Sequence, residues 1–172
     1  MTGKGSSQSG SAVDVVPSGW WADEMLGRLA RYLRIVGLDT AYVPGLDDEE
    51  LLRRSRGERR VLITRDRALA RRAEGSILLT QMQLEGQWRE MRARFPRLPC
   101  EPRFERCTVC NGRLAPLTDP ERASLGEEVP RPVRVSTVTL FRCGTCGHIY
   151  WEGSHTASVR RRLLAWSLES SP

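Results

Sequence analysis

Two C-x-x-C pairs constrain the fold of this chain more than any other feature of its sequence. The four cysteines are Cys107, Cys110, Cys143 and Cys146. A tight turn after the first cysteine of each pair points both sulfur atoms inward, so two pairs supply the tetrahedral thiolate set of structural zinc. Asn111, Gly112 and Gly147 follow the pairs, where such a turn requires a residue that tolerates a positive φ. The sequence therefore predicts a zinc ribbon whose closed site is structural rather than catalytic.

The expected compartment supports metal ligation by these cysteines. Redox-active pairs are the alternative, but two well-spaced pairs in one small segment favour zinc. Residues 1–12 are rich in glycine and serine and lack the apolar core of a signal peptide, so we expect a disordered tail. No run of about 18 apolar residues is present, which argues against a membrane span. We expect a cytoplasmic protein with Cys100 as a free thiol, because the cytosol disfavours disulfides.

The first part of the chain alternates short apolar segments with helical ones. Strands are predicted at 19–22, 39–43, 61–64 and 76–79, each followed by a helix. This alternation with short loops predicts an α/β fold, in which a parallel sheet is flanked by helices. After the proline-rich segment 96–102 we expect a ribbon strand at 133–141 and a last helix at 156–168. The expected division is a tail at 1–12, an α/β domain at 13–98, and a zinc ribbon with a C-terminal helix at 99–172.

Three aspartates, Asp23, Asp48 and Asp66, each follow a predicted strand and begin a helix. The carboxyl ends of parallel strands share one edge of the sheet, where ligand sites form. Helix capping alone is the plain alternative, because aspartate is a preferred N-cap residue. Three neighbouring carboxylates repel one another unless a cation neutralises them. Oxygen ligands favour Mg²⁺ or Mn²⁺, so the sequence predicts a magnesium or manganese site at this edge.

The excess of positive charge favours a polyanionic partner. The chain carries 27 Lys and Arg against 21 Asp and Glu, and Lys4 is its only lysine. Arginine suits bidentate phosphate contacts, although a basic soluble protein is the plain alternative. Arg28, Arg31 and Arg34 fall on the polar side of the first helix, with Gly37 as its expected stop. We predict RNA phosphate contacts for Arg28, Arg31, Arg65 and His155; solvated helix faces and a structural histidine are the alternatives.

Several segments together resemble the Mut-seven C-terminal RNase domain family. They are DEMLGRLARYLR at 23–34, DEELL at 48–52, LITRDR at 62–67, the two cysteine pairs and YWEGSH at 150–155. The resemblance covers about residues 20–166 and implies a PIN-like nuclease domain with an appended zinc ribbon. It also implies a metal-dependent ribonuclease, with Asp23, Asp48 and Asp66 as the catalytic acids that hold Mg²⁺ or Mn²⁺. Asp47 is the alternative to Asp48.

The chain departs from the family pattern after the fourth predicted strand. Members commonly carry an acidic residue there, whereas this chain has Thr80 and Gln81, with Glu85 slightly later. Two non-enzymatic alternatives therefore stay open. One is a non-catalytic RNA- or ribosome-binding adaptor, and the other is a protein-interaction module whose ribbon docks a partner. RNA is the expected partner, with the ribosome or tRNA as candidate sources; no oligomeric state is predicted.

Overall fold

The computed structural model describes residues 15–168, and the expected tail at 1–12 lies outside this range. The first half of the chain forms one parallel sheet of short strands. These are β1 (Trp20–Ala22), β2 (Thr40–Ala41), β3 (Val61–Thr64) and β4 (Ile77–Leu78), in the order β2-β1-β3-β4. Trp21 pairs with Ala41 on one side and with Leu62 on the other. The middle position of β1 places the ends of β2 and β3 on either side of its own end.

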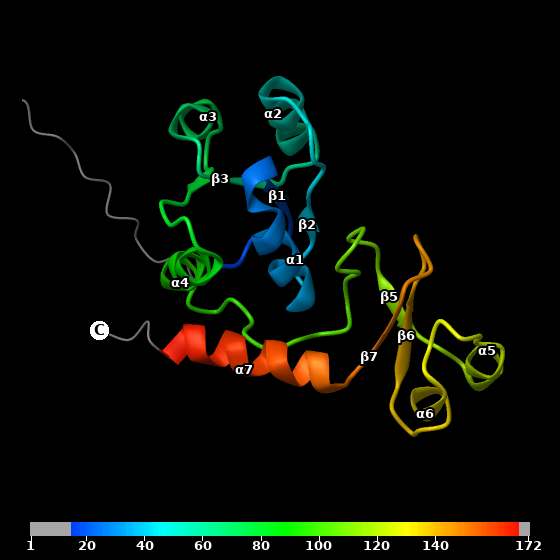
Figure 1. Ribbon diagram of the computed structural model, residues 1–172. Coiled ribbons are helices and arrows are strands. Elements are labelled where there is room, and N and C mark those ends of the chain that lie inside the picture. The colour runs from blue at the N-terminus through cyan, green and yellow to red at the C-terminus, as the bar shows by residue number, and fades with distance from the viewer. Residues whose placement is uncertain (1–14, 169–172) are drawn as a thin grey trace, which may run out of the picture.

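Helices cover both faces of this sheet (Figure 1). The helical elements are η1 (Glu24–Leu26), α1 (Gly27–Ile35), α2 (Asp48–Gly57), α3 (Arg67–Arg72) and α4 (Leu84–Arg94). Side chains alternate across β1, because successive residues of a strand point to opposite faces. Trp20 packs in the hydrophobic cluster that includes α1 and α4, whereas Trp21 packs in the cluster that includes α2 and α3. The predicted parallel sheet flanked by helices is confirmed.

Local backbone geometry confirms the predicted helix stop and the predicted turns after the cysteines. Gly37 has a φ of 88° directly after α1, where a side chain would be strained. Asn111 and Gly147 have φ values of 67° and 78° after the two cysteine pairs. These positive values let each C-x-x-C segment reverse direction around its sulfur atoms.

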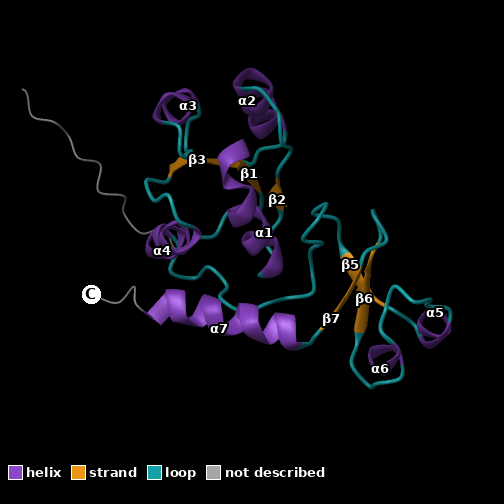
Figure 2. Cartoon of the chain, in the orientation of Figure 1, coloured by secondary structure: helices purple, strands orange, loops and turns teal. Residues whose placement is uncertain are grey.

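The zinc-ribbon segment forms a second, antiparallel sheet (Figure 2). Its strands are β5 (Leu114–Pro116), β6 (Leu140–Cys143) and β7 (Ile149–Trp151), in the order β5-β6-β7. The connection from β5 to β6 carries two short helices, α5 (Asp119–Ala123) and α6 (Arg131–Arg134). This connection packs its own small apolar cluster around Leu125, Val129 and Leu140.

The strand predicted at 133–141 is wrong over most of its length. Residues up to Arg134 belong to α6, and the strand begins only at Leu140. Pro132 lies in the first turn of α6, where its fixed φ is compatible with a helix. The guanidinium of Arg122 also donates hydrogen bonds to the carbonyls of Val133, Arg134, Ser136 and Val138. These carbonyls therefore have a partner without a neighbouring strand.

The C-terminal helix α7 (Ser154–Leu168) returns to the first half of the chain and packs across α4 (Figure 1). Val159 and Leu163 are buried in the same cluster as Trp20. Trp88 donates from Nε1 to Oγ of Ser167 at 3.4 Å. The predicted C-terminal helix is thus confirmed, and it contributes directly to the core of the α/β part.

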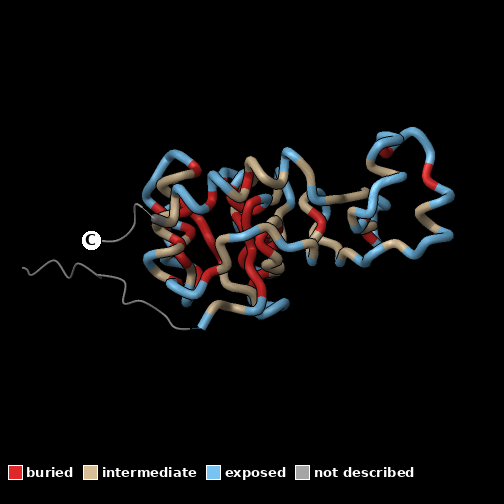
Figure 3. The backbone as a smooth tube through the Cα atoms, turned by 90° about the horizontal axis from the view of Figure 1, so that it is seen from below, coloured by how far each residue is buried: buried red, intermediate tan, exposed pale blue. Residues whose placement is uncertain are grey.

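Burial differs between the two parts of the chain. Figure 3 shows that buried segments concentrate around the parallel sheet, whereas most of the ribbon is exposed or intermediate. A segment with so few buried side chains depends on cross-links such as a metal site for its stability. Among the described residues, none of the helices combines the length and the apolar character needed to cross a bilayer.

Candidate functional site

The carboxyl edge of the parallel sheet brings two of the predicted acids into contact with one buried side chain. Asp23 follows β1, Asp66 follows β3, and Thr64 is the last residue of β3. The hydroxyl of Thr64 donates to Oδ2 of Asp23 at 2.6 Å and accepts from the backbone N–H of Asp66 at 2.9 Å. Thr64 is fully buried, whereas Asp23 is half-buried and Asp66 is exposed, so the bridge lies at the border between core and solvent. We call these three residues the acid corner.

Each acid of the corner also caps the helix that it begins. Oδ1 of Asp23 accepts from the backbone N–H of Glu24 at 2.6 Å. Oδ1 of Asp66 accepts from the backbone N–H groups of Leu69 at 3.0 Å and Ala68 at 2.6 Å. These backbone donors lower the pKa of Asp66, because they stabilise its charged form. Both carboxylates are therefore fixed in orientation by the backbone.

The third predicted acid stands apart from the acid corner. Asp48 is the first residue of α2, and its carboxylate lies 3.8 Å from Nη1 of Arg72. Asp47, the alternative, is the N-cap of α2 and accepts from the backbone N–H of Glu50 at 2.8 Å. Asp23, Asp48 and Asp66 do not form a ready-made ligand cluster. Within the described part of the chain, the four cysteines are the one group whose potential ligand atoms all lie within 4.8 Å of one another.

A different acid occupies the end of β4, where the family pattern suggests one. Glu90 of α4 accepts hydrogen bonds from the backbone N–H of Thr80 at 2.9 Å and from the Thr80 hydroxyl. Glu85, which the sequence suggested, instead forms an ion pair of 2.6 Å with Arg89. The sequence did not indicate Glu90, because this residue lies in the following helix and its side chain extends back to Thr80. Thr64 was also missed, although its place at the end of a fully apolar strand was a signal for burial.

The predicted phosphate-binding residues lie in two places. Arg28 and Arg31 are exposed on α1, and Arg65 follows β3 and contacts the sulfur of Met82. Arg31 and His155 line one cavity at the ribbon, and none of the residues that line this cavity belongs to the acid corner. The structure therefore places Arg31 and His155 at the ribbon cavity and Arg28 and Arg65 outside it.

Arg34 was expected on the polar side of α1, and that expectation is wrong. Its side chain is buried, because the ribbon packs over this part of the helix. Its Nε donates to the carbonyl of Thr40 at 2.8 Å, and its Nη1 donates to those of Val109 at 2.9 Å and Thr108 at 3.2 Å. Burial lowers the pKa of Arg34, and the nearby Cys107 and Cys110 oppose this shift. Arg34 thus joins the first cysteine turn to the α/β part.

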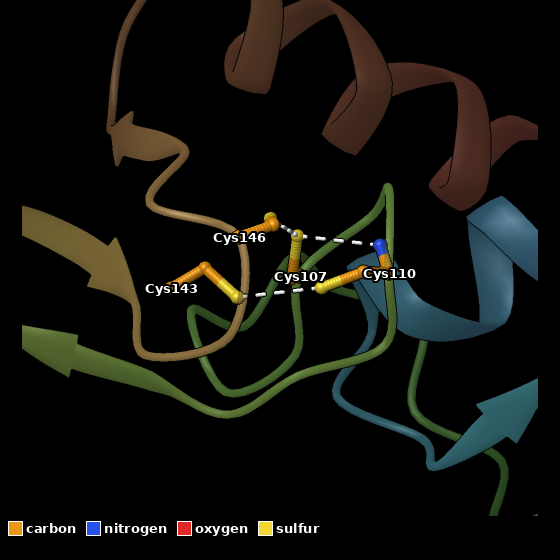
Figure 4. A group of neighbouring side chains, drawn as sticks. All are labelled: Cys107, Cys110, Cys143 and Cys146. Carbon is orange, nitrogen blue, oxygen red and sulfur yellow. Dashed lines mark hydrogen bonds between the residues drawn. The ribbon is translucent and has the colours of Figure 1, made fainter.

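The four cysteine sulfur atoms converge at one point between the two turns (Figure 4). Sγ of Cys107 lies 3.5 Å from that of Cys146, and Sγ of Cys110 lies 3.4 Å from that of Cys143. Zinc–sulfur bonds of about 2.3 Å impose sulfur–sulfur separations of about 3.8 Å in a tetrahedron. The donor set and its spacing therefore fit one tetrahedral metal ion such as zinc, as the sequence predicted.

The thiol pKa values show why this group requires a cation. Burial raises the pKa of Cys143, but the backbone N–H groups of Cys146 and Thr145 outweigh it and lower the value to about 6. The backbone N–H of His148 lowers the pKa of Cys146, but burial and the other three thiols raise it to about 12. Four thiolates cannot coexist here without positive charge, which a bound metal ion such as zinc would supply.

Comparison with protein families finds a match to the model described as the Mut7-C RNAse domain. The match covers residues 19–163, which include both sheets, the acid corner and all four clustered cysteines. Comparisons with curated proteins and with solved structures find no match. Because the family match extends over most of the sequence, the chain belongs to the Mut7-C RNAse domain family, whose description indicates a nuclease-like role.

Proposed function

We propose that this protein is a metal-dependent ribonuclease that hydrolyses RNA phosphodiester bonds at the carboxyl edge of its parallel sheet. The observation that carries the proposal is the acid corner, where buried Thr64 connects Asp23 with the segment that bears Asp66. Both acids follow neighbouring strands at the carboxyl edge of a parallel sheet, where ligand sites form. The arginine-rich surface and the family membership favour RNA as the substrate.

The free lone pairs of the acid corner fit a hard divalent cation. A carboxylate has about four lone-pair positions, and both hydrogen bonds to Asp66 use its Oδ1 atom. Within the described residues, no hydrogen bond reaches its Oδ2 atom. Asp23 and Asp66 would hold Mg²⁺ or Mn²⁺, with Asp48 as the third ligand after release from Arg72. Such an ion, when bound, supplies a water of lowered pKa and polarises the scissile phosphate.

The arginines beside this edge would hold the flanking phosphates. Arg28 is exposed one residue into α1, which begins directly after η1, and Arg65 lies between Thr64 and Asp66. Guanidinium groups bind phosphate oxygens in pairs and thereby fix the register of the strand. Binding should weaken steeply with salt, because each neutralised phosphate releases counterions. The thiol-rich metal site supports a reducing compartment, so we place this activity in the cytoplasm.

The test is cleavage of a fluorescently labelled single-stranded RNA with Mn²⁺ or Mg²⁺ added, or with neither. The wild-type protein should cleave RNA only when the ion is added. Asp23→Asn should lower the cleavage rate by more than about 100-fold, which is a larger loss than expected for a residue that only orients a metal ligand. Asp119→Asn makes the same change on the exposed α5 and should retain activity. Cleavage that survives Asp23→Asn contradicts the proposed centre.

A non-catalytic RNA- or ribosome-binding adaptor is the second candidate function. It is favoured by the protein partners of the acids, since Asp48 contacts Arg72 and Glu90 accepts from Thr80. Carboxylates satisfied in this way do not require a metal ion. The same assay separates the two, because an adaptor binds RNA or ribosomes without cleaving RNA. Absence of RNA binding even at low salt would instead favour a protein-interaction module.

A further inference from the structure

A cavity of about 350 Å³ lies where α1, the ribbon and the start of α7 meet. Its size is within the range of small-molecule sites in proteins. The helix α1 contributes Arg31 and Ile35, the strand β7 contributes Trp151, and α7 contributes His155. The proposed hydrolysis makes no use of this cavity.

Two aromatic side chains form fixed parts of the cavity wall. One face of Phe104 stacks on Phe141, with ring centroids 4.8 Å apart and an interplanar angle of 5°. Trp151 lies against Gly153, where an added Cβ would be only 3.2 Å from the indole Nε1 atom. Rings held in this way lose little freedom when a planar ligand packs against them. Nucleobases stack on such rings with little sequence preference.

The same cavity presents positive charge and free backbone donors. Arg31, Arg103 and Arg106 line it, with Arg106 paired to Asp39 at 2.9 Å, and none of the lining residues is acidic. Arg103 has a long ion pair of 3.6 Å with Glu105, whereas Arg31 has no ion pair within the described part of the chain. The first backbone N–H groups of the 15-residue α7 have no acceptor inside the helix, and the preceding Gly153 has no side chain to cap them. Helix starts of this kind bind phosphate.

We propose that this cavity binds one unpaired nucleotide of an RNA strand. Its base would pack against Phe104 and Trp151, and its phosphate would lie near Arg31 and the start of α7. Apolar rings beside cations and free amides match a nucleotide, which combines a planar base with an anion. The proposal rests on the proposed function, because it adds a second contact for the same RNA.

The helix α1 connects this cavity with the acid corner. It begins at Gly27, directly after the η1 turn that follows Asp23, and ends at Ile35, which lines the cavity. Its nine residues span about 13 Å at 1.5 Å per residue. Arg28 and Arg31 are exposed one turn apart along it. A strand cut at the acid corner can therefore follow α1 to the cavity within a few nucleotides.

The test is binding of labelled single-stranded RNA oligomers, each with one abasic nucleotide at a different position, in buffer without Mg²⁺ or Mn²⁺. Fluorescence anisotropy of the wild-type protein should show one position where loss of the base weakens binding by about fivefold or more. Gly153→Leu fills the cavity and should abolish this position effect. Gly57→Leu is the matched control, because a Cβ added at Gly57 meets nothing within 4 Å.

A second pair of variants covers the case in which Gly153→Leu does not fold. Arg31→Gln should weaken binding and reduce the slope of log K against log salt by about 0.7, the value for one phosphate contact to a single strand. Arg161→Gln removes the same charge from the exposed part of α7 outside the cavity, and it should change neither the affinity nor the salt slope.

A flat abasic profile, or a position effect that persists in folded Gly153→Leu, would overturn the cavity proposal. So would a wild-type protein that does not bind single-stranded RNA. A position-specific effect without any cleavage supports nucleotide binding in the cavity and contradicts the proposed nuclease activity. Cleavage with a flat abasic profile supports the nuclease activity and contradicts nucleotide binding in the cavity.

Discussion

The hydroxyl of Thr64 donates a hydrogen bond of 2.6 Å to Oδ2 of Asp23, and so fixes a carboxylate of one strand end from the neighbouring strand. Thr64→Val keeps the shape of this buried residue but removes its hydroxyl. We expect a loss of about 1–2 kcal/mol in unfolding free energy. Cleavage should fall by about 10- to 100-fold, and the Mn²⁺ concentration for half-maximal cleavage should rise.

The conservative variant separates positioning from stability. Thr64→Ser retains the hydroxyl and should recover most of the activity and the wild-type Mn²⁺ dependence. Urea unfolding monitors stability in parallel. An unchanged Mn²⁺ dependence in folded Thr64→Val would show that Thr64 only supports the fold.

Removal of the metal from the cysteines should affect the parallel sheet as well as the ribbon. The backbone N–H of Thr40 in β2 donates to Oδ1 of Asn111 at 3.0 Å, and Asn111 follows Cys110 directly. Because the cysteine turn depends on the metal, chelation should release this acceptor. Hydrogen exchange should then accelerate at Thr40 and across β5–β7.

The central strand provides the internal control for that experiment. Ile63 in β3 is paired on both sides within the sheet and should stay protected after chelation. Metal analysis of the untreated protein should give one zinc per chain. Unchanged exchange at Thr40 in the zinc-free protein would contradict the coupling between the cysteine turn and β2.

Arg34 should be one of the most sensitive positions of the fold. Its guanidinium donates to backbone carbonyls of Thr40, Thr108 and Val109 from a buried site. Arg34→Met keeps apolar packing but leaves these carbonyls without their donor, at an expected cost of about 2–4 kcal/mol in unfolding free energy. Arg34→Lys should recover only part, because an ammonium group lacks the planar fork. Arg31→Met is the exposed control on the same helix, and urea unfolding measures all three.

The sequence predicted those features that depend on short-range pattern. The apolar run that contains Trp20 and Trp21 is buried on both faces of the sheet, as expected for a central parallel strand. Gly37 ends α1 because a positive φ is needed there, and a glycine at this position is enough to predict the helix end from the sequence. The spacing of the cysteines likewise predicted the metal-binding geometry, because each C-x-x-C pair forms its turn within a few residues.

Features that depend on distant segments could not be predicted. The helical spacing of Arg34 places it on the polar side of α1, and its side chain is buried only because the ribbon packs on this helix. Arg122 satisfies carbonyls that a strand would otherwise pair, and so shortens β6 from a distance. Glu90 reaches the end of β4 from the following helix. In each case one long polar side chain, rather than local propensity, decides the outcome.

The contact that Asp39 makes between the ribbon and the sheet should be sensitive to acid. Its carboxylate accepts from Arg60 at 2.5 Å and from Asn111 at 2.7 Å, and pairs with Arg106 at 2.9 Å. Burial raises the pKa of Asp39, but the hydrogen bonds from Arg60 and Asn111 outweigh it and lower the pKa below its ordinary value. Stability from this group is therefore complete above the unfolded pKa of about 3.9 and is lost as the pH falls through the lower folded pKa.

The matched variant Asp39→Asn isolates this contribution. At pH 7 it should unfold at lower urea concentration, with a loss of about 1–3 kcal/mol for a partly buried charged hydrogen-bond group. The difference in unfolding free energy from the wild-type protein should shrink as the pH falls below about 4 and vanish once Asp39 is protonated in both states. Acid would also protonate the cysteine sulfurs and release any metal ion that they hold in both proteins, so the measured quantity is the difference between the two proteins at each pH. A difference that stays constant from pH 7 to pH 3 would show that the charge of Asp39 does not hold the ribbon against the sheet.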